Sequence, residues 1–315
     1  MEMLIDGLVL PALDNASISD MYNGGLDAAV YPAAIWHDTA DALHQFAKVR
    51  RVIMESDRGV LIRSAGDIVE ARRSGGVGIV IGWQNSDGLG GNLDLLPMYH
   101  ELGLRTLSIA FNYANSAGAG CYERSDGGLT SFGRELVAVC NDVGILLDLT
   151  HVGDRTGADV VSVSRRPVCY SHASPRHLQD SVRNKTDEQL RAVAETGGIV
   201  GLAALPHYLP NELHSTVADY LAVVEHVLNV VGEEHVGFGT DMTPGQSSEF
   251  LAYTASRKGF GSATVDYSVP PRLSGLSNFS DYQDVLDRLV RALGPRKTEK
   301  FAGENWLRVF RDTWS

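Results

Sequence analysis

Short apolar runs alternate along this chain with longer segments in which apolar residues recur at helical spacing. The short runs are rich in β-branched residues and have the length of buried parallel strands. The pattern predicts eight such strands, at residues 3–10, 26–34, 78–83, 104–111, 145–149, 168–171, 199–203 and 236–239.

Segments of helical period fill most of the intervals between these runs. They predict helices at residues 39–55, 65–73, 93–102, 131–143, 154–164, 186–196 and 216–231. Thr186, followed three residues later by Gln189, is typical of a capping box, and glycines stand where three of the helices should end, at positions 103, 144 and 197.

Eight β–α units in 315 residues have the size of a (β/α)8 TIM barrel. A doubly wound open sheet is the alternative, but no G-x-G-x-x-G follows the first strand. We therefore expect one barrel domain over residues 1–315, with a long loop at about 243–278 and additional helices at about 280–314.

Composition narrows the classes of function. With 27 Lys and Arg against 39 Asp and Glu, the net charge of −12 argues against nucleic acid or a membrane surface as a partner. Three cysteines without C-x-x-C spacing, and a start without a basic, apolar leader pattern, favour a cytoplasmic protein. A homodimer is the default expectation for such a protein.

Polar residues follow three of the predicted strands where each strand ends. These are His151 after the fifth strand, His172 after the sixth and Asp241 after the eighth. In a barrel the carboxyl ends of the strands meet at one rim, where active sites lie. Two imidazoles and a carboxylate form a ligand set suited to Zn²⁺ or a similar divalent ion. The alternative for each residue is an ordinary hydrogen-bonded role at a strand end.

Further rim candidates follow from the same geometry. We expect Gln84, Cys121, Tyr122, Glu123 and Arg183 to contact a substrate. Arg183 could bind a carboxylate through two parallel hydrogen bonds, or be a surface arginine. For Cys121 the alternatives are a thiolate ligand and a buried inert thiol.

At these residues the sequence resembles the membrane (renal) dipeptidase family, zinc peptidases with an amidohydrolase-like barrel. The segments that carry the resemblance are 146–152, 166–173, 183–184, 236–241 and 303–310. The resemblance implies that His151 and His172 bind the second zinc of a pair, and that Asp241 binds the first zinc and handles protons. It also implies that Arg183 holds the carboxylate of a dipeptide.

The chain departs from the family pattern where the first zinc should bind. The family's first strand ends in Asp-Gly-His-x-Asp, but here Asp6 and Gly7 are followed by Leu8 and Leu10 at the two ligand positions. The bridging glutamate of the family falls on Gln84, and a substrate-contacting histidine falls on Phe111.

Replacing the bridging carboxylate by an amide removes charge that offsets the repulsion between two cations. We therefore expect one divalent metal, zinc first, held by His151, His172 and Asp241, with an open position for water. Asp241 can be a ligand or the general base, and a metal-free site is the alternative to both.

Three functions compete on these grounds. The first is a metal-dependent hydrolase that cleaves a dipeptide or a similar small amide with a carboxylate. The second is a barrel of the same ancestry with different chemistry on an amino-acid derivative. The third is a non-catalytic protein that binds a carboxylate, since a fold does not determine a function.

Overall fold

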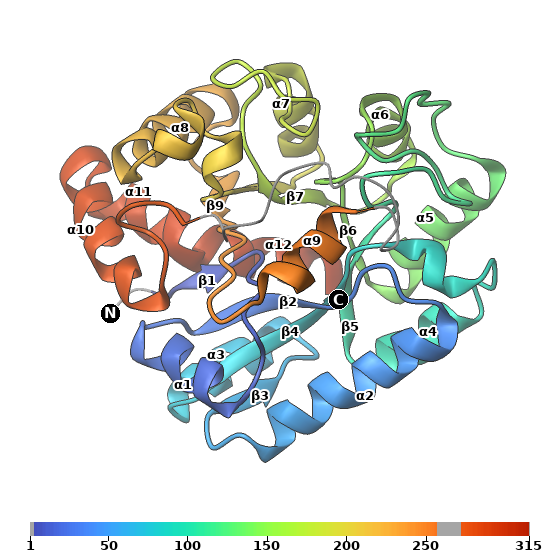
Figure 1. The fold of residues 1–315 in the computed structure, drawn as a ribbon, viewed down its shortest axis with the longest axis horizontal. Helices are drawn as coiled ribbons and strands as arrows, with labels where there is room; N and C mark the ends of the chain where they lie inside the picture. Colours follow the sequence, from blue (N-terminus) through green and yellow to red (C-terminus); the bar gives the residue numbers. More distant parts are fainter. Residues whose placement is uncertain (1–2, 257–271, 315) are drawn as a thin grey trace.

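The computed structural model describes residues 3–256 and 272–314. Eight parallel strands form a closed barrel surrounded by helices, as the sequence predicts (Figure 1). They are β1 (Ile5–Asp6), β2 (Ala28–Ala34), β4 (Val77–Trp83), β5 (Leu104–Ser108), β6 (Leu146–Asp148), β7 (Val168–Ala173), β8 (Ile199–Leu202) and β9 (Val236–Phe238).

Parallel pairing runs around the whole ring, from β1 through β2 to β4 and then in sequence order to β9. The pairing of Asp6 in β1 with Phe238 in β9 closes it. One further strand, β3 (Gly59–Leu61), pairs with the first half of β4 and is not among the predicted strands. Its three residues are only half-buried, so they carry too little pattern to be recognised.

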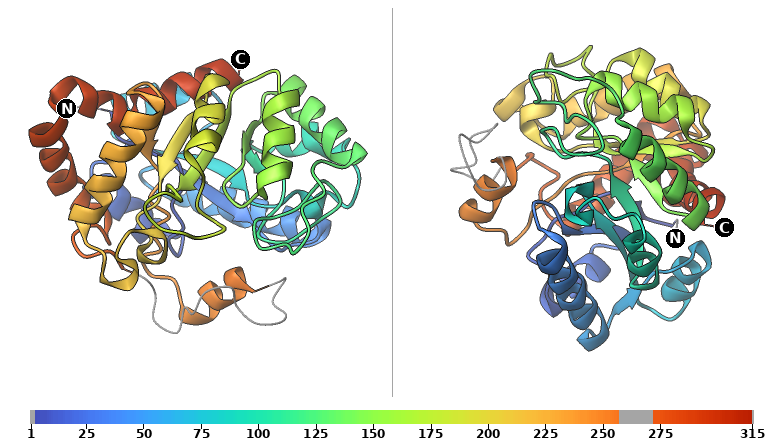
Figure 2. Two further views of the ribbon diagram at one scale, coloured as in Figure 1. Left: turned by 90° about the horizontal axis from the view of Figure 1, so that it is seen from above. Right: turned by 90° about the vertical axis from the view of Figure 1, so that its right-hand side faces the viewer.

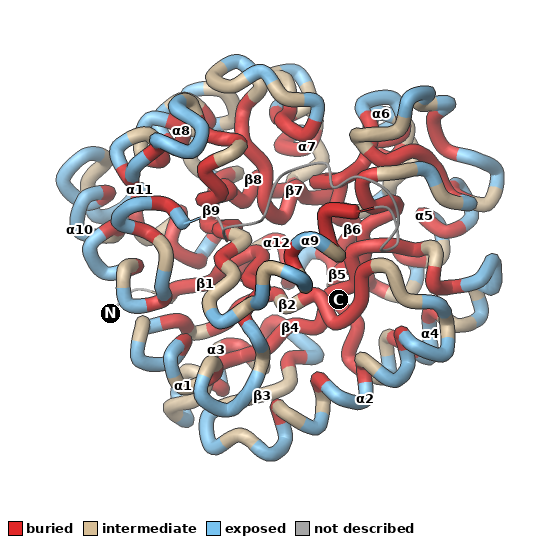
Figure 3. Tube along the Cα trace, viewed as in Figure 1, coloured by how far each residue is buried: buried red, intermediate tan, exposed pale blue. Residues whose placement is uncertain are grey.

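Helices cover the outside of the barrel, and their outer faces are exposed while the strands are buried (Figure 3). Those up to the last strand are α1 (Asn15–Asn23), α2 (Thr39–Glu55), α3 (Ala65–Arg73), α4 (Leu95–Glu101), α5 (Ser131–Val143), α6 (Asp154–Val163), α7 (Asp187–Glu195) and α8 (Val217–Val231). Among these, α1 is not predicted, because it is mostly polar and buries only Ile18 and Met21. Within the described residues, no helix is long and apolar enough to span a membrane.

The C-terminal segment forms the expected helices. They are α10 (Tyr282–Leu293), α11 (Pro295–Glu299), a π-helical turn (Lys300–Glu304) and α12 (Asn305–Trp314). Trp306 of α12 is fully buried, and its indole N–H donates to the carbonyl oxygen of Phe238 at 2.7 Å. An added Cβ on Gly7 or Gly237 would lie within 3 Å of this indole, so glycines make room for it beside the strands. The last helix therefore packs against the barrel strands.

The expected long loop at about 243–278 contains a helix, α9 (Ser248–Ala255). Residues 257–271 of this loop lie outside the described residues. Figure 2 shows α9 and the C-terminal helices on opposite sides of the barrel. Thr254 and Ala255 of α9 contribute to a pocket at the strands' carboxyl ends, and this pocket is the candidate site.

Candidate metal and substrate site

A pocket of about 420 Å³, including its opening to solvent, lies at the carboxyl ends of the strands. Its walls come from segments that follow most of the barrel strands, so the closed fold brings distant parts of the chain together. The lining residues are Leu10, Ile35, Gln84, Phe111, Asn112, His151, Arg183, Leu205, Tyr208, Asp241, Thr254 and Ala255.

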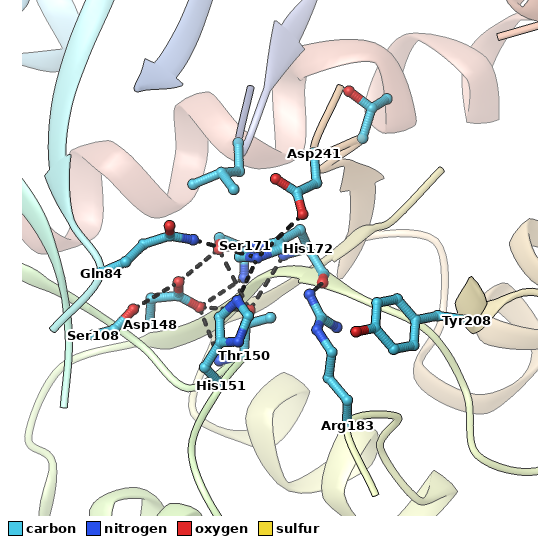
Figure 4. A network of polar contacts seen from close by, with 12 residues as sticks. Gln84, Ser108, Asp148, Thr150, His151, Ser171, His172, Arg183, Tyr208 and Asp241 are labelled. Atoms are coloured by element: carbon cyan, nitrogen blue, oxygen red, sulfur yellow. Dashed lines mark hydrogen bonds and ion pairs between the residues drawn. The ribbon is translucent and has the colours of Figure 1, made fainter. Parts of the chain in front are cut away.

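Two buried imidazoles face each other at the floor of this pocket. The Nε2 atoms of His151 and His172 are 2.9 Å apart (Figure 4). Burial lowers the pKa of both rings well below the usual 6.5, and the nearby cation of Arg183 lowers it further. Both rings are therefore neutral near pH 7, with one nitrogen protonated in each.

Neighbouring side chains determine which nitrogen carries that proton. The Nδ1 of His151 is 2.7 Å from the amide oxygen of Asn112, so Nδ1–H donates there. The Nδ1 of His172 is 2.6 Å from the hydroxyl oxygen of Ser171, whose own proton goes to Asp148 at 2.6 Å. Ser171 must therefore accept from His172. In both rings Nε2 is left with a lone pair.

Asp148 anchors this arrangement from below. One carboxylate oxygen accepts hydrogen bonds from the hydroxyls of Ser108 and Ser171. The other accepts from the backbone N–H and hydroxyl of Thr150 and from the backbone N–H of Ser171. Asp148 thus connects the ends of three neighbouring strands and fixes the His172 ring through Ser171.

Asp241 approaches the imidazoles from the other side of the pocket. Its Oδ2 is 3.8 Å from Nε2 of His172. Asp241 has a left-handed backbone, with φ of 54°, and its N–H donates to the carbonyl oxygen of Leu8. Burial raises the pKa of its carboxyl to about 7, with Arg183 opposing and Asp6 reinforcing the shift. The carboxyl therefore exchanges a proton close to neutral pH.

The donor set fits one divalent ion. Two lone pairs that face each other at 2.9 Å repel unless a cation lies near both. Among the described residues, the close donor is the Gln84 amide, whose Nε2 is 3.3 Å from Nε2 of His172. In the described part of the chain, no three His, Cys, Asp or Glu side chains are already gathered as a ligand cage. The two imidazoles and the more distant Asp241 are the ligands that the site offers.

A second ion lacks ligands of its own. Leu8 and Leu10 are buried where the family's first-strand ligands would stand, and Gln84 supplies a neutral amide in place of a bridging carboxylate. Hydrocarbon side chains cannot coordinate a cation, and an amide binds divalent metals weakly. The described site therefore does not fit the two-zinc arrangement.

Arg183 supplies the positive charge of the pocket. Its side chain is 1% exposed, its Nη2 donates to the carbonyl oxygen of His172 at 2.8 Å, and its guanidinium lies 4.6 Å over the Tyr208 ring. Among the described residues, its buried Nη1 has no hydrogen-bond partner. A buried guanidinium with an unsatisfied NH₂ group is costly, so an anion in the pocket would be strongly favoured.

The other predicted contact residues divide into two groups. Gln84 lines the pocket, whereas Cys121, Tyr122 and Glu123 are not among the lining residues. Tyr122 reaches the hydroxyl of Tyr208 at 3.3 Å, and the Cys121 thiol faces the amide oxygen of Asn112 at 3.9 Å. Glu123 accepts backbone N–H groups of its own loop.

Sequence reasoning missed several residues that shape the pocket. Asn112, which orients His151, follows a predicted strand end, and its left-handed φ of 61° is a conformation that asparagine tolerates well. The signal that could have identified Asn112 is its position directly after a predicted strand. Tyr208 and Leu205 follow strand β8, in and just before a 3-10 turn (Pro206–Tyr208), and gave no such signal.

Comparisons with known proteins identify the family to which the chain belongs. The model "Membrane dipeptidase (Peptidase family M19)" matches residues 12–251. A solved amidohydrolase from Pseudomonas aeruginosa is 35% identical, with 99% of this chain and 97% of that chain covered and a TM-score of 0.96. A metallopeptidase from Rhodobacter sphaeroides, solved with a phosphinate mimic of L-Ala-D-Ala, is 21% identical with a TM-score of 0.81 at 99% coverage of both chains, a likeness of fold alone.

Curated relatives match a smaller share of their own length. A dipeptidase of Claviceps purpurea is 28% identical over 86% of this chain and 60% of its own, and one of Aspergillus oryzae is 34% identical over 76% and 52%. The chain thus spans between half and about 60% of the length of these relatives. The family model and the Pseudomonas structure together place the chain in the membrane dipeptidase family.

Proposed function

We propose that this protein is a metal-dependent hydrolase that cleaves a dipeptide or a similar small amide with a carboxylate, through a mononuclear site. One observation carries the proposal. The Nε2 atoms of His151 and His172 lie 2.9 Å apart, and Asn112 and Ser171 each place an oxygen within 2.7 Å of an Nδ1 atom, which assigns the ring protons to Nδ1. Imidazoles fixed in this tautomer are typical of metal ligands.

His151, His172 and one carboxylate oxygen of Asp241 would hold the ion. A bound divalent ion lowers the pKa of its water to about 7 and polarises a carbonyl group. The second oxygen of Asp241 accepts the proton from the attacking water and returns it to the leaving amine. Burial raises the pKa of this carboxyl to about 7 in the metal-free protein, and a bound cation would lower it, so the carboxyl would be ionised and able to accept the proton.

Arg183 would orient the substrate. Its unsatisfied Nη1 and the stacking of its guanidinium on Tyr208 favour a carboxylate at this end of the pocket. The hydrogen bond from Nη2 to the carbonyl oxygen of His172 fixes the guanidinium relative to the ligand residue. The distance between carboxylate and scissile amide is thereby limited to that of a small amino-acid derivative.

The test combines metal content with turnover. The protein purified without chelator, then loaded with Zn²⁺ or Mn²⁺, should hold close to one ion per chain and hydrolyse small amides of amino acids. His151→Ala should lose both properties. His44→Ala, at an exposed histidine on the outer helix α2, is the matched control and should retain both.

Three results would contradict the proposal. Absence of tight metal binding together with no activation by either added ion would exclude the hydrolase. Two tightly bound ions per chain would exclude the mononuclear site. Equal turnover in wild type and His151→Ala would trace the activity to a contaminant.

A further inference from the structure

The pocket offers few charged groups to the two charged ends of a dipeptide. Apart from the imidazoles, Arg183 and Asp241 are its only ionisable charges among the described lining residues. A dipeptide carries one carboxylate and one ammonium group. The carboxylate can pair with Arg183, but Asp241 would then have to balance the ammonium while also serving the metal and the transferred proton.

Five apolar side chains contribute to the other walls. They are Leu10, Ile35, Phe111, Leu205 and Ala255. Leu10 is held beside Asp241 because its N–H donates to the carbonyl oxygen of Met242 at 2.8 Å. All five are buried, so each adds hydrocarbon surface to the pocket.

Phe111 does not offer an open aromatic face to a cation. Its ring lies 4.1 Å from the His151 ring, at 38° to it, and an edge-to-face contact with Trp36 at 5.1 Å covers another side. The other polar side chains among the described lining residues are uncharged: the amide of Gln84, the amide oxygen of Asn112, which already accepts from His151, and the hydroxyls of Tyr208 and Thr254. They are weak partners for a desolvated ammonium.

Transfer of an ammonium into such a pocket without a dedicated carboxylate is unfavourable, whereas an alkyl group gains by burial there. Resting on the proposed function, we infer that the preferred substrates are N-acyl amino acids, in which an uncharged alkyl acyl group replaces the amino-terminal residue. Water adds to the amide carbonyl, the C–N bond breaks, and the carboxylate of the acyl group and a free amino acid leave. The proton released by the water goes to the leaving amine.

A matched pair of substrates tests the inference directly. Propionyl-alanine differs from alanyl-alanine only by the missing ammonium group, so their ratio isolates the charge effect. The metal-loaded protein should show a kcat/KM at least about tenfold higher for propionyl-alanine, in whichever configuration of the carboxy-terminal alanine it accepts. An equal or higher value for alanyl-alanine would overturn the inference and leave the proposed hydrolase intact.

A binding measurement separates the two proposals. Titration calorimetry of both compounds into the full chain should give tighter binding of propionyl-alanine even if neither is turned over. In that case the hydrolase would fail while the inference on ligand class stood. Tighter binding of alanyl-alanine would overturn the inference.

A substitution at Ile35, which lines the pocket and is not a metal-ligand position of the family, provides an independent test. Ile35→Asp places a carboxylate on the pocket wall and should shift the ratio at least about tenfold towards alanyl-alanine. Ile35→Asn has nearly the same size without the charge and should leave the ratio near that of wild type. Thermal unfolding of both variants checks that they fold, and an equal shift in both would overturn the electrostatic explanation.

Discussion

Ser171 illustrates how one hydroxyl determines what a neighbouring imidazole can bind. It accepts from Nδ1 of His172 at 2.6 Å only because it donates its own proton to Asp148. Reversal of this order would move the imidazole proton to Nε2 and block metal binding. The serine is therefore a positioning residue for the metal site, although it is buried beneath it.

Ser171→Ala should weaken metal binding about 10- to 100-fold, because His172 loses the acceptor that holds its tautomer. Chelator competition measures this affinity. Ser108→Ala is the matched control, since Ser108 also donates to Asp148, at 3.1 Å, with no hydrogen bond to His172. Equal affinities in the two variants would show that Asp148, rather than the serine, orients the ring.

Asp241 makes metal binding depend on pH. Its pKa of about 7 means that the metal-free protein holds a proton there below pH 7, which a cation must displace. His151 and His172, whose pKa values lie well below 6.5, are already neutral and add little. Metal affinity should rise up to tenfold per pH unit below about pH 7 and level off above it.

The raised pKa of Asp241 also makes the stability of the folded protein depend on pH. Because folding raises this pKa from 3.8 to about 7, the folded metal-free protein holds the proton more tightly than the unfolded chain, and stability falls as pH rises across that window.

Asp241→Asn removes the titration, so the metal affinity of this variant should be weaker than that of wild type and nearly independent of pH between 6 and 8. A wild-type slope in this variant would assign the titration to another group.

The last helix stabilises the barrel by one deeply inserted side chain. A Cβ on Gly7 would lie 2.0 Å from the Trp306 indole, with buried neighbours on every side. Gly7→Ala should therefore lower the free energy of unfolding by about 3 kcal/mol, at the upper end of overpacking effects. Urea unfolding followed by circular dichroism measures the loss.

A double variant with a smaller ring at position 306 tests whether the indole causes this loss of stability. Trp306→Phe costs stability by itself, but the double variant Gly7→Ala with Trp306→Phe should be less destabilised than the sum by about 1–3 kcal/mol. Gly157→Ala, in the interior of α6 with nothing within 4 Å of the new Cβ, should be neutral or slightly stabilising. Strict additivity in the double variant would mean that the indole does not limit Gly7.

Helix α12 shows which features of helices and strands the sequence predicts and which it does not. The barrel strands were predictable because parallel strands buried on both faces are continuous apolar runs. The short β3 and the polar α1 lack such a signal. Helices near the C-terminus were predictable from periodicity, but the insertion of Trp306 beside Gly7 and Gly237 depends on contacts between residues some 70 to 300 positions apart.

For the site, strand ends were enough to predict that His151, His172 and Asp241 lie near one another, since all carboxyl ends meet at one rim. Arg183 was predictable as a candidate only through the family resemblance and its position after a strand. The role of Asn112 and the exclusion of Cys121 and Glu123 from the pocket depend on loop conformation, which periodicity does not encode.

At the scale of the whole molecule, the proposed metal binding would be coupled to folding. The proposed ligands come from residues 151, 172 and 241, so they meet only when the barrel has closed between β6 and β9. An ion that binds the folded chain alone stabilises it by RT ln(1 + [M]/Kd), about 2.7 kcal/mol at a hundredfold excess over Kd. Unfolding of the whole barrel thus reports on the number of ions bound.

The slope of the free energy of unfolding against the logarithm of the metal concentration distinguishes one bound ion from two. With free Zn²⁺ buffered well above Kd, the free energy of unfolding in urea should rise by about 1.4 kcal/mol for each tenfold increase in metal, which is the value for a single site. A two-metal site would give about twice that slope. His172→Ala should abolish the dependence, whereas His44→Ala should preserve it, because a histidine outside the pocket cannot link metal to barrel closure. A wild-type slope near 2.8 kcal/mol per decade would show that the chain holds a second ion despite Leu8, Leu10 and Gln84.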